Sequence, residues 1–450
     1  MNANSVPRPA GFDSKGPVRP DYVPVDDYIS KDFAELEVKH LWTRVWQMAC
    51  REEEIPKVGD YYTYDIVDQS IIVVRTADDE IKAYHNVCPH RGRRLTGGCG
   101  HTARLHCRYH GWQWDLNGQN TLVVDREEWG AGLTDEDVAL KTVKVGRWGG
   151  WVYVNLDPQS ETLDQALMPA KAILDPYDLG GLRYQWRKST ILPCNWKVAL
   201  EAFNEGYHVQ TTHRQMLEYM DDVTVSFAHG RHAMFAYWEA LPSGMRSRRI
   251  GGPKDDDIRP GLLAYMEDMA RTLNAGSSVQ AVHAARRVMQ EVPPGTPPLE
   301  VLGKFGQFIY EQIVAQGAKF PPITPEQMRA GGIDWHLFPN QIMLQSPTGL
   351  LGYRARPNGH DPDSCIWDVY SLQRYAPGTE PKVEVEWSQE HFDEDFWGKI
   401  LTQDYQNMED VQRGMKSMAF AGARPNPKQE IGVANFHRAL HEFIEAGMGK

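Results

Sequence analysis

Hydrophobic positions follow a helical period near the start of the chain and then change to a strand-like pattern. In "DFAELEVKHLWTRVW" (32–46) the apolar side chains recur on roughly one face, which predicts an amphipathic helix. From about Asp60, β-branched and aromatic residues dominate "YYTYDIVDQSIIVVRTADDEIKAYHNVC", and "ADDE" interrupts them as a hairpin turn does. Short strands continue to "GGWVYVNLD". We therefore expect residues 46–160 to form a compact all-β domain.

After residue 160 the pattern is mixed. "STILPC" begins as a strand, and Asn195 is a predicted N-cap for a helix that starts at Trp196. Residues 256–335 contain three helical stretches separated by turns rich in proline and glycine. Further strands are expected in "WHLFPNQIMLQSP" and "DSCIWDVYSLQRYAP", and helices in "DEDFWGKILTQDYQNMEDVQRGMKS" and "NFHRALHEFIEAG".

These elements predict an α+β protein in which the all-β domain is joined to a larger domain of sheet and helices. The larger domain is expected to cover 161–450, with 256–335 as a helical insertion. Residues 1–45 are expected to supply an N-terminal arm and a helix that pack on it. The first twenty residues hold four prolines without periodicity, which favours an extended arm.

Composition excludes several classes of protein. The net charge of −12 argues against nucleic acid as a main partner. No run of eighteen apolar residues occurs, so no membrane span is expected, and the N-terminus lacks an export signal. Six cysteines at irregular spacing predict a cytoplasmic protein without a disulfide framework.

One short basic stretch, "CPHRGRRLTGGCGHTARLHCRYHGW", gathers metal-ligating side chains. Cys88 and His90 form one half, Cys107 and His110 the other, with sixteen residues between the halves. Zinc accepts two thiolates and two imidazoles, although Cys-x-His is tighter than the usual finger spacing. The alternative is a Rieske [2Fe–2S] cluster, in which two Cys bind one iron and two His the other.

The pattern closely resembles the Rieske motif of ring-hydroxylating oxygenases, which is C-x-H-R-G followed by C-x-x-H-G-W. The resemblance includes Arg91, Gly92, Gly111 and Trp112, and it implies that Cys88, His90, Cys107 and His110 hold the cluster. Three other residues between the halves fit neither ligand pair and are interpreted as structural: Cys99, His101 and His106. Four arginines form a solvated rim that suits an acidic electron donor: Arg93, Arg94, Arg104 and Arg108.

A second candidate metal site contains His208 and His213. Their five-residue spacing is weak evidence, because other histidine pairs in the chain show it as well. The surrounding "NWKVALEAFNEGYHVQTTH" resembles the catalytic-iron segment of the same oxygenases, in which two His and one carboxylate bind Fe(II). The resemblance in "QDYQNMEDVQRG" assigns the third ligand to Asp404, with Glu409 and Asp410 as competitors on the helix surface.

Asn204 and Glu205 are the residues expected to assist catalysis. The family usually has Asp three residues before the first iron His, where it bridges to a Rieske His of the neighbouring subunit; here the residue is Glu205. Glu205 and His208 share a helix face at this spacing, so the bridge is expected to persist. Some members that act on quaternary ammonium substrates also carry Glu, which weakens the presumption of aromatic dihydroxylation.

The resemblance implies a helix-grip catalytic domain and a terminal oxygenase that activates O₂ to mono- or dihydroxylate an aromatic or other hydrophobic organic substrate. O- or N-dealkylation, or oxidation of a quaternary ammonium compound, is the alternative. It also implies a homotrimer, or an α3β3 assembly with a small β subunit. The chain has no G-x-G-x-x-G fingerprint, so NAD(P)H and FAD must act through a partner reductase, with or without a ferredoxin.

Substrate identity is left open by the sequence. Four residues flank the iron segments and are the pocket candidates: Phe203, Met216, Leu217 and Phe338. The strand "LFPNQI" (337–342) is expected to border the pocket. Met and aromatic residues of the helical insertion, such as Tyr265 and Met269, are expected to be core. A cluster-bearing electron carrier without catalysis and a non-enzymatic zinc module are the remaining alternatives, although the former does not account for residues 161–450.

Overall fold

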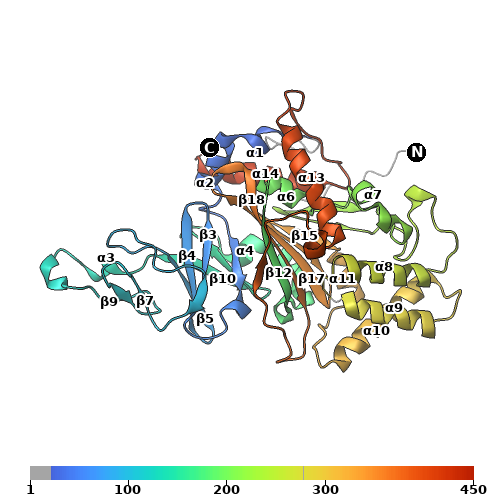
Figure 1. Ribbon diagram of the computed structural model, residues 1–450, viewed down its shortest axis with the longest axis horizontal. Coiled ribbons are helices and arrows are strands. Elements are labelled where there is room, and N and C mark those ends of the chain that lie inside the picture. The colour runs from blue at the N-terminus through green and yellow to red at the C-terminus, as the bar shows by residue number, and fades with distance from the viewer. Residues whose placement is uncertain (1–21, 277, 450) are drawn as a thin grey trace. The chain divides into compact units, whose positions relative to one another are not determined.

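The computed structural model describes residues 22–276 and 278–449, which form two compact units (Figure 1). The β unit is Glu37–Ala166, and the large unit combines the chain up to Leu36 with Leu167 onward. The extended arm expected for the first twenty residues lies outside the described residues. The fold class is the expected one, an all-β unit together with a larger unit of antiparallel sheet and helices.

The β unit contains a seven-stranded antiparallel sheet of order β2-β11-β10-β5-β4-β3-β6 and a three-stranded sheet of order β7-β8-β9. Its strands are β2 (Gln47–Arg51), β3 (Asp60–Ile66), β4 (Gln69–Ala77), β5 (Glu80–His85), β6 (Cys99–His101), β7 (Leu105–His106), β8 (Gln113–Trp114), β9 (Asn120–Leu122), β10 (Thr142–Trp148) and β11 (Trp151–Asn155). The helices that lie wholly within this unit are short: η1 (Glu52–Glu54), η2 (Arg126–Trp129) and α3 (Asp135–Val138). Helix α4 (Leu163–Leu167) crosses the boundary by one residue.

The core of the β unit includes the loops that carry the cysteines. Ile71 to Val74 are fully buried along β4, because this strand lies between β3 and β5 and is covered on both faces. Ile72 and Val74 pack in one cluster with Trp112, Trp114, Cys88 and Cys107. Apolar packing therefore anchors both cysteine-bearing loops.

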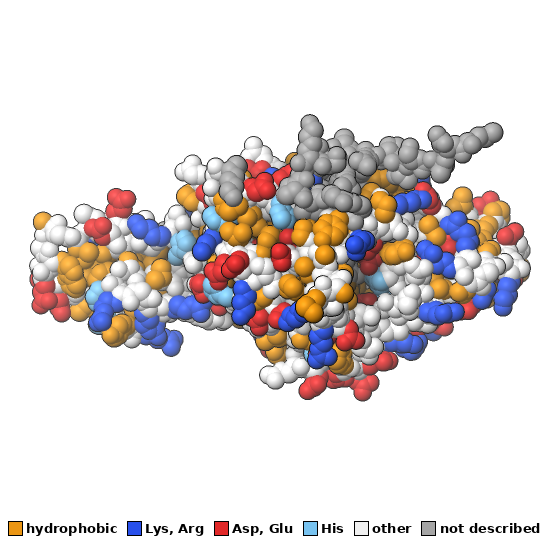
Figure 2. Space-filling view, turned by 90° about the horizontal axis from the view of Figure 1, so that it is seen from above, with side chains coloured by type: hydrophobic (Ala, Val, Ile, Leu, Met, Phe, Trp, Pro, Cys, Tyr) orange, Lys and Arg blue, Asp and Glu red, His pale blue; other side chains and the backbone are white. Residues whose placement is uncertain are grey.

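The large unit is built on an eight-stranded sheet of order β13-β14-β15-β16-β17-β18-β12-β19, antiparallel except where β19 pairs with β12. Its strands are β12 (Arg183–Leu192), β13 (Val225–His229), β14 (His232–Ala236), β15 (Asp334–Leu337), β16 (Gln341–Gln345), β17 (Gly349–Asn358), β18 (Asp361–Gln373) and β19 (Val385–Trp387). A separate pair joins β1 (Val23–Pro24) to β20 (Gly422–Ala423). Figure 2 shows acidic and basic side chains interspersed over most of the face in view.

The large unit also contains helices on the sheet and a group, α8 to α10, whose members pack on one another (Figure 1). They are α1 (Asp26–Ile29), α2 (Lys31–His40, which crosses the unit boundary), α5 (Ala170–Leu174), α6 (Trp196–Glu201), α7 (Val209–Thr212), α8 (Arg259–Thr272), α9 (Ser278–Glu291), α10 (Pro298–Ala315), α11 (Pro325–Ala330), α12 (Glu394–Trp397), α13 (Lys399–Met415) and α14 (Ile431–Gly447), with short 3-10 turns η3 (Asp175–Tyr177), η4 (Leu179–Gly181), η5 (Arg214–Glu218) and η6 (Arg248–Ile250). Helix α6 packs on β17 and β18, and α14 packs on β13 and β14. None of the helices in the described ranges is both long and apolar enough to span a membrane.

Local sequence signals account for several of these elements. The Asn195 side chain accepts a hydrogen bond from the Lys197 N–H, which confirms the expected N-cap of α6. The helices expected within 256–335 are present as α8, α9 and α10. The segment expected to form one helix over 393–417 is divided into α12 and α13, because Gly398 adopts φ +82°, a left-handed conformation that ends the first helix.

A buried ionic cluster attaches α1 to α14 and α6. His437 is fully buried, and its two ring nitrogens lie 2.6 Å from Asp27 Oδ2 and 2.6 Å from Glu201 Oε1. Tyr28 donates to the other oxygen of Glu201 at 2.9 Å. Burial opposes protonation of His437, but the charges and hydrogen bonds of Glu201 and Asp27 outweigh it and raise the pKa to about 9. A doubly protonated imidazole is required to donate to both carboxylates.

We expect H437Q to destabilise the protein in a pH-dependent way. Because the folded pKa of about 9 exceeds the ordinary value of 6.5, the imidazolium stabilises the fold fully below pH 6.5, and this stability is lost as the pH rises through 9. The difference in free energy of unfolding between wild type and H437Q should be about 3 kcal/mol at low pH and should shrink above pH 9. Urea unfolding at several pH values measures it, with H283Q on the exposed face of α9 as control. An equal difference at pH 6 and pH 10 would contradict the assignment.

Candidate metal and substrate sites

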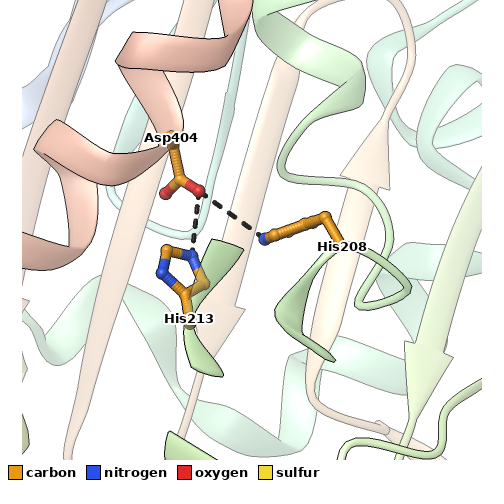
Figure 3. A group of neighbouring side chains, drawn as sticks. All are labelled: His208, His213 and Asp404. Atoms are coloured by element: carbon orange, nitrogen blue, oxygen red, sulfur yellow. Dashed lines mark ion pairs between the residues drawn. The ribbon is translucent and has the colours of Figure 1, made fainter. Parts of the chain in front are cut away.

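Two histidines and one aspartate converge inside the large unit. The Nε2 atoms of His208 and His213 lie 3.6 Å and 2.9 Å from Oδ1 of Asp404 (Figure 3). Among the described residues, the possible ligands that form a group of three or more with donor atoms within 4.8 Å of one another are these three: His208, His213 and Asp404. The structure thus brings together the three residues that the sequence suggested as a set.

Local backbone geometry aims both imidazoles at the same point. His208 and His213 are the N-cap and C-cap residues of the four-residue helix α7. On a regular helix, residues five apart point about 140° away from each other. His213 has φ −113° and ψ 43°, outside the helical region, so the chain turns at this residue. The break allows the second ring to face the same carboxylate.

Hydrogen bonds on the far side of each ring fix the tautomer. His208 Nδ1 lies 2.6 Å from Glu205 Oε1, and His213 Nδ1 lies 3.0 Å from Gln403 Oε1. Acceptors at both Nδ1 positions favour Nδ1–H tautomers and leave both Nε2 lone pairs directed at Asp404. Metal-binding histidines usually donate their second N–H in this manner. Gln403, which precedes Asp404 on α13, is a supporting residue that the sequence analysis did not identify.

Electrostatics favour a cation among these three residues. Asp404 is only 5% exposed. Burial lowers the pKa of His208, but the charge and hydrogen bond of Glu205, together with Asp404, raise it to about 9. Without another cation, a proton therefore supplies the compensating charge. Two imidazole nitrogens and a carboxylate oxygen form the donor set that suits non-haem Fe(II) and leaves coordination positions for other ligands.

Two cavities share part of their walls at these residues, since Ala202, Glu205, His208 and Asp404 line both. The aromatic cavity, of about 300 Å³, is bounded by α7, α8 and the sheet and includes Phe203, Phe235, Tyr237, Tyr265 and Tyr353 in its wall. The second cavity, of about 400 Å³, is bounded by α6, α13 and the start of α14. Its wall contains Glu201, Arg424 and Glu430. Burial, with the charges of Glu205 and Glu201, raises the pKa of Glu430 to about 7.

The four suggested pocket residues occupy different places. Phe203 and Met216 line the aromatic cavity, whereas Leu217 and Phe338 do not. Phe338 packs on Phe443, with ring centroids 5.2 Å apart. Asn204 is buried outside both cavities, and neither atom of its amide has a hydrogen-bond partner in the described part of the chain.

Several cavity residues were missed by sequence reasoning. Tyr265 and Met269 pack against a buried hydrophobic cluster, as expected, and they also line the aromatic cavity from one face of α8. Tyr237 follows β14, Asp334 begins β15 and Tyr353 lies in β17. Only the pairing of these strands brings the last three residues together, and no local sequence signal marks them.

The cysteine and histidine ligands of the β unit lie in two loops with the same backbone design. In one loop the Gly92 N–H donates to the Cys88 carbonyl at 2.9 Å, and in the other the Gly111 N–H donates to the Cys107 carbonyl at 3.0 Å. The two glycines have φ of +76° and +79°, which a side chain would strain. Each loop therefore reverses at a glycine four residues after its cysteine.

The four donors of these loops divide into a buried pair and an outer pair. Cys88 and Cys107 are each 2% exposed, and burial, with the neighbouring Cys107 thiol, raises the pKa of Cys88. The rings of His90 and His110 are more exposed and lie 4.6 Å apart. His90 also stacks on Trp112 at 4.9 Å. Two thiols on one side and two imidazoles on the other fit the two irons of a Rieske cluster.

A single zinc ion fits this arrangement less well. Tetrahedral zinc needs four donor atoms around one point, and these four are absent from the sets of donors within 4.8 Å of one another among the described residues. Nearby residues have structural contacts: His101 Nδ1 lies 2.9 Å from Asp60, and Arg94 forms an ion pair with Asp65 at 2.7 Å.

Comparison with known proteins identifies both units. The family model described as "Ring hydroxylating alpha subunit (catalytic domain)" matches residues 177–446, and the "Rieske [2Fe-2S] domain" model matches residues 45–128. These ranges contain, respectively, the three converging residues of the large unit and the two loops of the β unit.

Individual relatives are more distant. The oxygenase subunit of glycine betaine monooxygenase from Pseudomonas aeruginosa is 30% identical over 247 residues, which cover 51% of this chain and 57% of that protein. The alpha subunit of biphenyl 2,3-dioxygenase from Rhodococcus jostii is 32% identical over 191 residues, 41% of this chain and 42% of that protein. The matched segments thus span about half the length of these curated relatives.

Solved structures share the fold. A quaternary ammonium Rieske monooxygenase in complex with L-carnitine superposes with a TM-score of 0.64 at 17% identity, over 95% of this chain and 96% of that one. With both family models matched in order, the chain belongs to the family of ring-hydroxylating alpha subunits, and it carries a Rieske [2Fe–2S] cluster and a mononuclear non-haem iron.

Proposed function

We propose that the protein is the terminal oxygenase component of a Rieske oxygenase system. Cys88, His90, Cys107 and His110 would hold the [2Fe–2S] cluster, and His208, His213 and Asp404 the mononuclear iron. When bound, the iron supplies reductive activation of O₂ for oxidation of an organic substrate. The observation that carries the proposal is the position of His208 and Asp404 in the wall shared by two cavities.

The two cavities suit different tasks. The aromatic cavity is enclosed by apolar side chains and is large enough for a small organic molecule. The second cavity has charged residues in its wall and also reaches His208 and Glu205. Substrate would therefore approach the iron ligands from the first cavity, and electrons would arrive from the side of the second. This separation keeps the electron donor away from the reacting substrate.

Glu205 is the positioning residue between these sides. One oxygen accepts from the ring of His208, and the other accepts from the backbone N–H groups of Tyr207 and His208. The carboxylate is 8% exposed, so these bonds hold it in place away from bulk water. In this position Glu205 orients His208 and would connect it to an electron donor on the side of the second cavity. Glu201 and Glu430 add negative charge beside it.

The partners follow from what the chain lacks and from its relatives. Its sequence contains no nicotinamide fingerprint, so reducing equivalents would come from NAD(P)H through a separate flavin reductase, with or without a ferredoxin. We propose a homotrimer, alone or with a small β subunit, in which the cluster of one subunit serves the iron of the next. A solved relative is described with inter-subunit electron transfer, which supports this arrangement. In such a trimer each subunit contacts the next through the same pair of different surfaces, so three subunits form a closed ring.

Family membership leaves the substrate open. The similar proteins named above include one that acts on glycine betaine and one that acts on biphenyl. The proposed reaction is therefore O₂-dependent hydroxylation, with N- or O-dealkylation as its variant when the oxidised carbon is bonded to nitrogen or oxygen. The cytoplasm is the proposed location, since the cluster depends on reduced cysteines and both metal centres depend on cellular reductants.

Replacing Asp404 tests the mononuclear site. D404A should lower the iron content from about three to about two atoms per chain while acid-labile sulfide stays near two, because it removes the one carboxylate ligand and spares the cluster. D410A is the matched control, since Asp410 lies on the same helix and is exposed. Iron and sulfide analysis of anaerobically purified protein measures both. Unchanged iron in D404A, or the same loss in D410A, would refute the ligand assignment.

Replacing Glu205 tests its positioning role. In E205Q the side chain keeps its size but loses its charge, so the iron content should stay unchanged while reoxidation of the chemically reduced cluster by O₂ slows by about 10–100-fold. Stopped-flow absorption of the cluster measures this rate. E218Q, an exposed residue paired with Arg246 at 3.0 Å, serves as control. Reoxidation of E205Q at the wild-type rate would show that electrons do not depend on this carboxylate.

A further inference from the structure

One carboxyl group in the aromatic cavity has no partner in the protein. Asp334 begins β15, where it pairs across the sheet with Phe235 of β14 and Leu344 of β16. Its side chain lines the cavity and is 1% exposed. Neither carboxyl oxygen has a hydrogen-bond partner within the described ranges. The carboxyl group thus borders the same space as His208, His213 and Asp404.

Such a group is costly to keep in a fold. A buried polar group without a hydrogen bond destabilises a protein, and a buried charge without a partner does so more strongly. Burial alone raises the pKa of Asp334 well above its ordinary range. No hydrogen-bond donor among the described residues compensates for this. A cationic ligand in the cavity would supply the missing partner.

The other carboxylates of the cavity wall are already satisfied. Glu205 contacts His208, and Asp404 contacts both histidines. Asp221 accepts from the Arg248 guanidinium at 2.9 Å and from the Leu241 N–H at 2.9 Å. Asp334 is therefore the carboxyl group in this wall that is left for a ligand.

The wall contains no lysine or arginine, and its two histidines, His208 and His213, are already held by Asp404. Four of its residues are acidic. A ligand carboxylate would find no lysine or arginine to pair with and would face Asp334 across a small cavity. The charge distribution therefore favours a cation and disfavours an anion or a zwitterion.

Aromatic side chains complete the environment. Phe203, Phe235, Tyr237, Tyr265 and Tyr353 all contribute to the wall. Burial raises the pKa of the Tyr237 and Tyr353 phenols, which line the same cavity as Asp334, and the Asp334 carboxyl adds to both shifts. Aromatic faces attract organic cations, most strongly where water is excluded. Alkylated ammonium groups combine such a charge with an apolar surface.

We propose that Asp334 is the specificity-determining residue of the aromatic cavity and that it selects a tertiary or quaternary amine without an acidic group. The inference rests on the proposed function for the role of the cavity and adds the class of its substrate. It also separates this protein from its similar relatives, because glycine betaine and carnitine both carry a carboxylate. The nitrogen of the ligand lies against Asp334, and the aromatic rings cover its alkyl groups.

Three small probes test this preference on the wild-type holoenzyme. Choline and 3,3-dimethylbutan-1-ol have the same shape and differ in one positive charge, and glycine betaine adds a carboxylate to the cation. Anaerobic calorimetry should show that choline binds at least tenfold more tightly than either of the other two. Equal binding of choline and its neutral analogue, or binding of glycine betaine as tight as that of choline, would overturn the proposal. The proposal would also be overturned if neither choline nor the larger cation benzyltrimethylammonium bound.

The variant D334N identifies the residue responsible. Asn keeps the shape but cannot ionise to pair with a bound cation, so the preference for choline over its neutral analogue should fall to less than threefold. The melting temperature should not decrease, because a buried carboxyl without a partner is removed. D256N, which changes an exposed aspartate of the same unit, should keep the full preference. A D334N protein that retains the tenfold preference would contradict the role of Asp334.

These measurements are independent of turnover. Binding is measured without O₂ or reductant, and the visible spectrum of the cluster reports whether each protein is loaded. If the protein bound choline selectively but consumed no O₂ with a reductase, the proposed oxygenase function would fail and the cation site would stand. If an active oxygenase instead bound the neutral analogue more tightly than choline, the cation site would fail and the proposed oxygenase function would stand.

Discussion

The meeting of Asp404 with two imidazoles out of water is the constraint on which the large unit depends. The histidines belong to α7 and the aspartate to α13, about 190 residues later in the chain. A buried carboxylate is tolerated only where cations or donors surround it. Here Glu205 and Gln403 hold the outer nitrogens of the two rings, so the inner nitrogens can face only Asp404. The packing of α6 on β17 and β18 and the break at Gly398 before α13 set the positions of these segments.

The same residues separate two environments with different electrostatics. On one side, aromatic rings and a single unpartnered carboxyl group form a small cavity; on the other, charged side chains line a second one. Under the proposed function two such spaces are needed, since a substrate and an electron donor would both approach one metal. The proposed function does not by itself account for the unpartnered carboxyl group in the aromatic cavity. We attribute that group to the positive charge of the proposed ligand.

The features that sequence analysis could anticipate depend on local spacing. Cys88, His90, Cys107 and His110 lie in two five-residue loops whose glycines adopt left-handed conformations, and the loop pattern is visible in the sequence. The N-cap at Asn195 is equally local. Asp404 could be chosen over Asp410 only by resemblance, because the two carboxylates differ in burial, which depends on the packing of α13. Asp334, Tyr237 and Tyr353 were missed because they come from or next to different strands and meet only through the order of the sheet. In the helical insertion, Tyr265 and Met269 pack against a buried cluster as expected, but helical spacing alone did not indicate that they also line the cavity.

The most direct test of the account is the iron and acid-labile sulfide content of anaerobically purified wild-type protein, combined with EPR spectra before and after reduction with dithionite. The account predicts about three irons and about two sulfides per chain, with a Rieske-type signal that appears on reduction. Zinc without sulfide, and no signal from a reduced cluster, would contradict it.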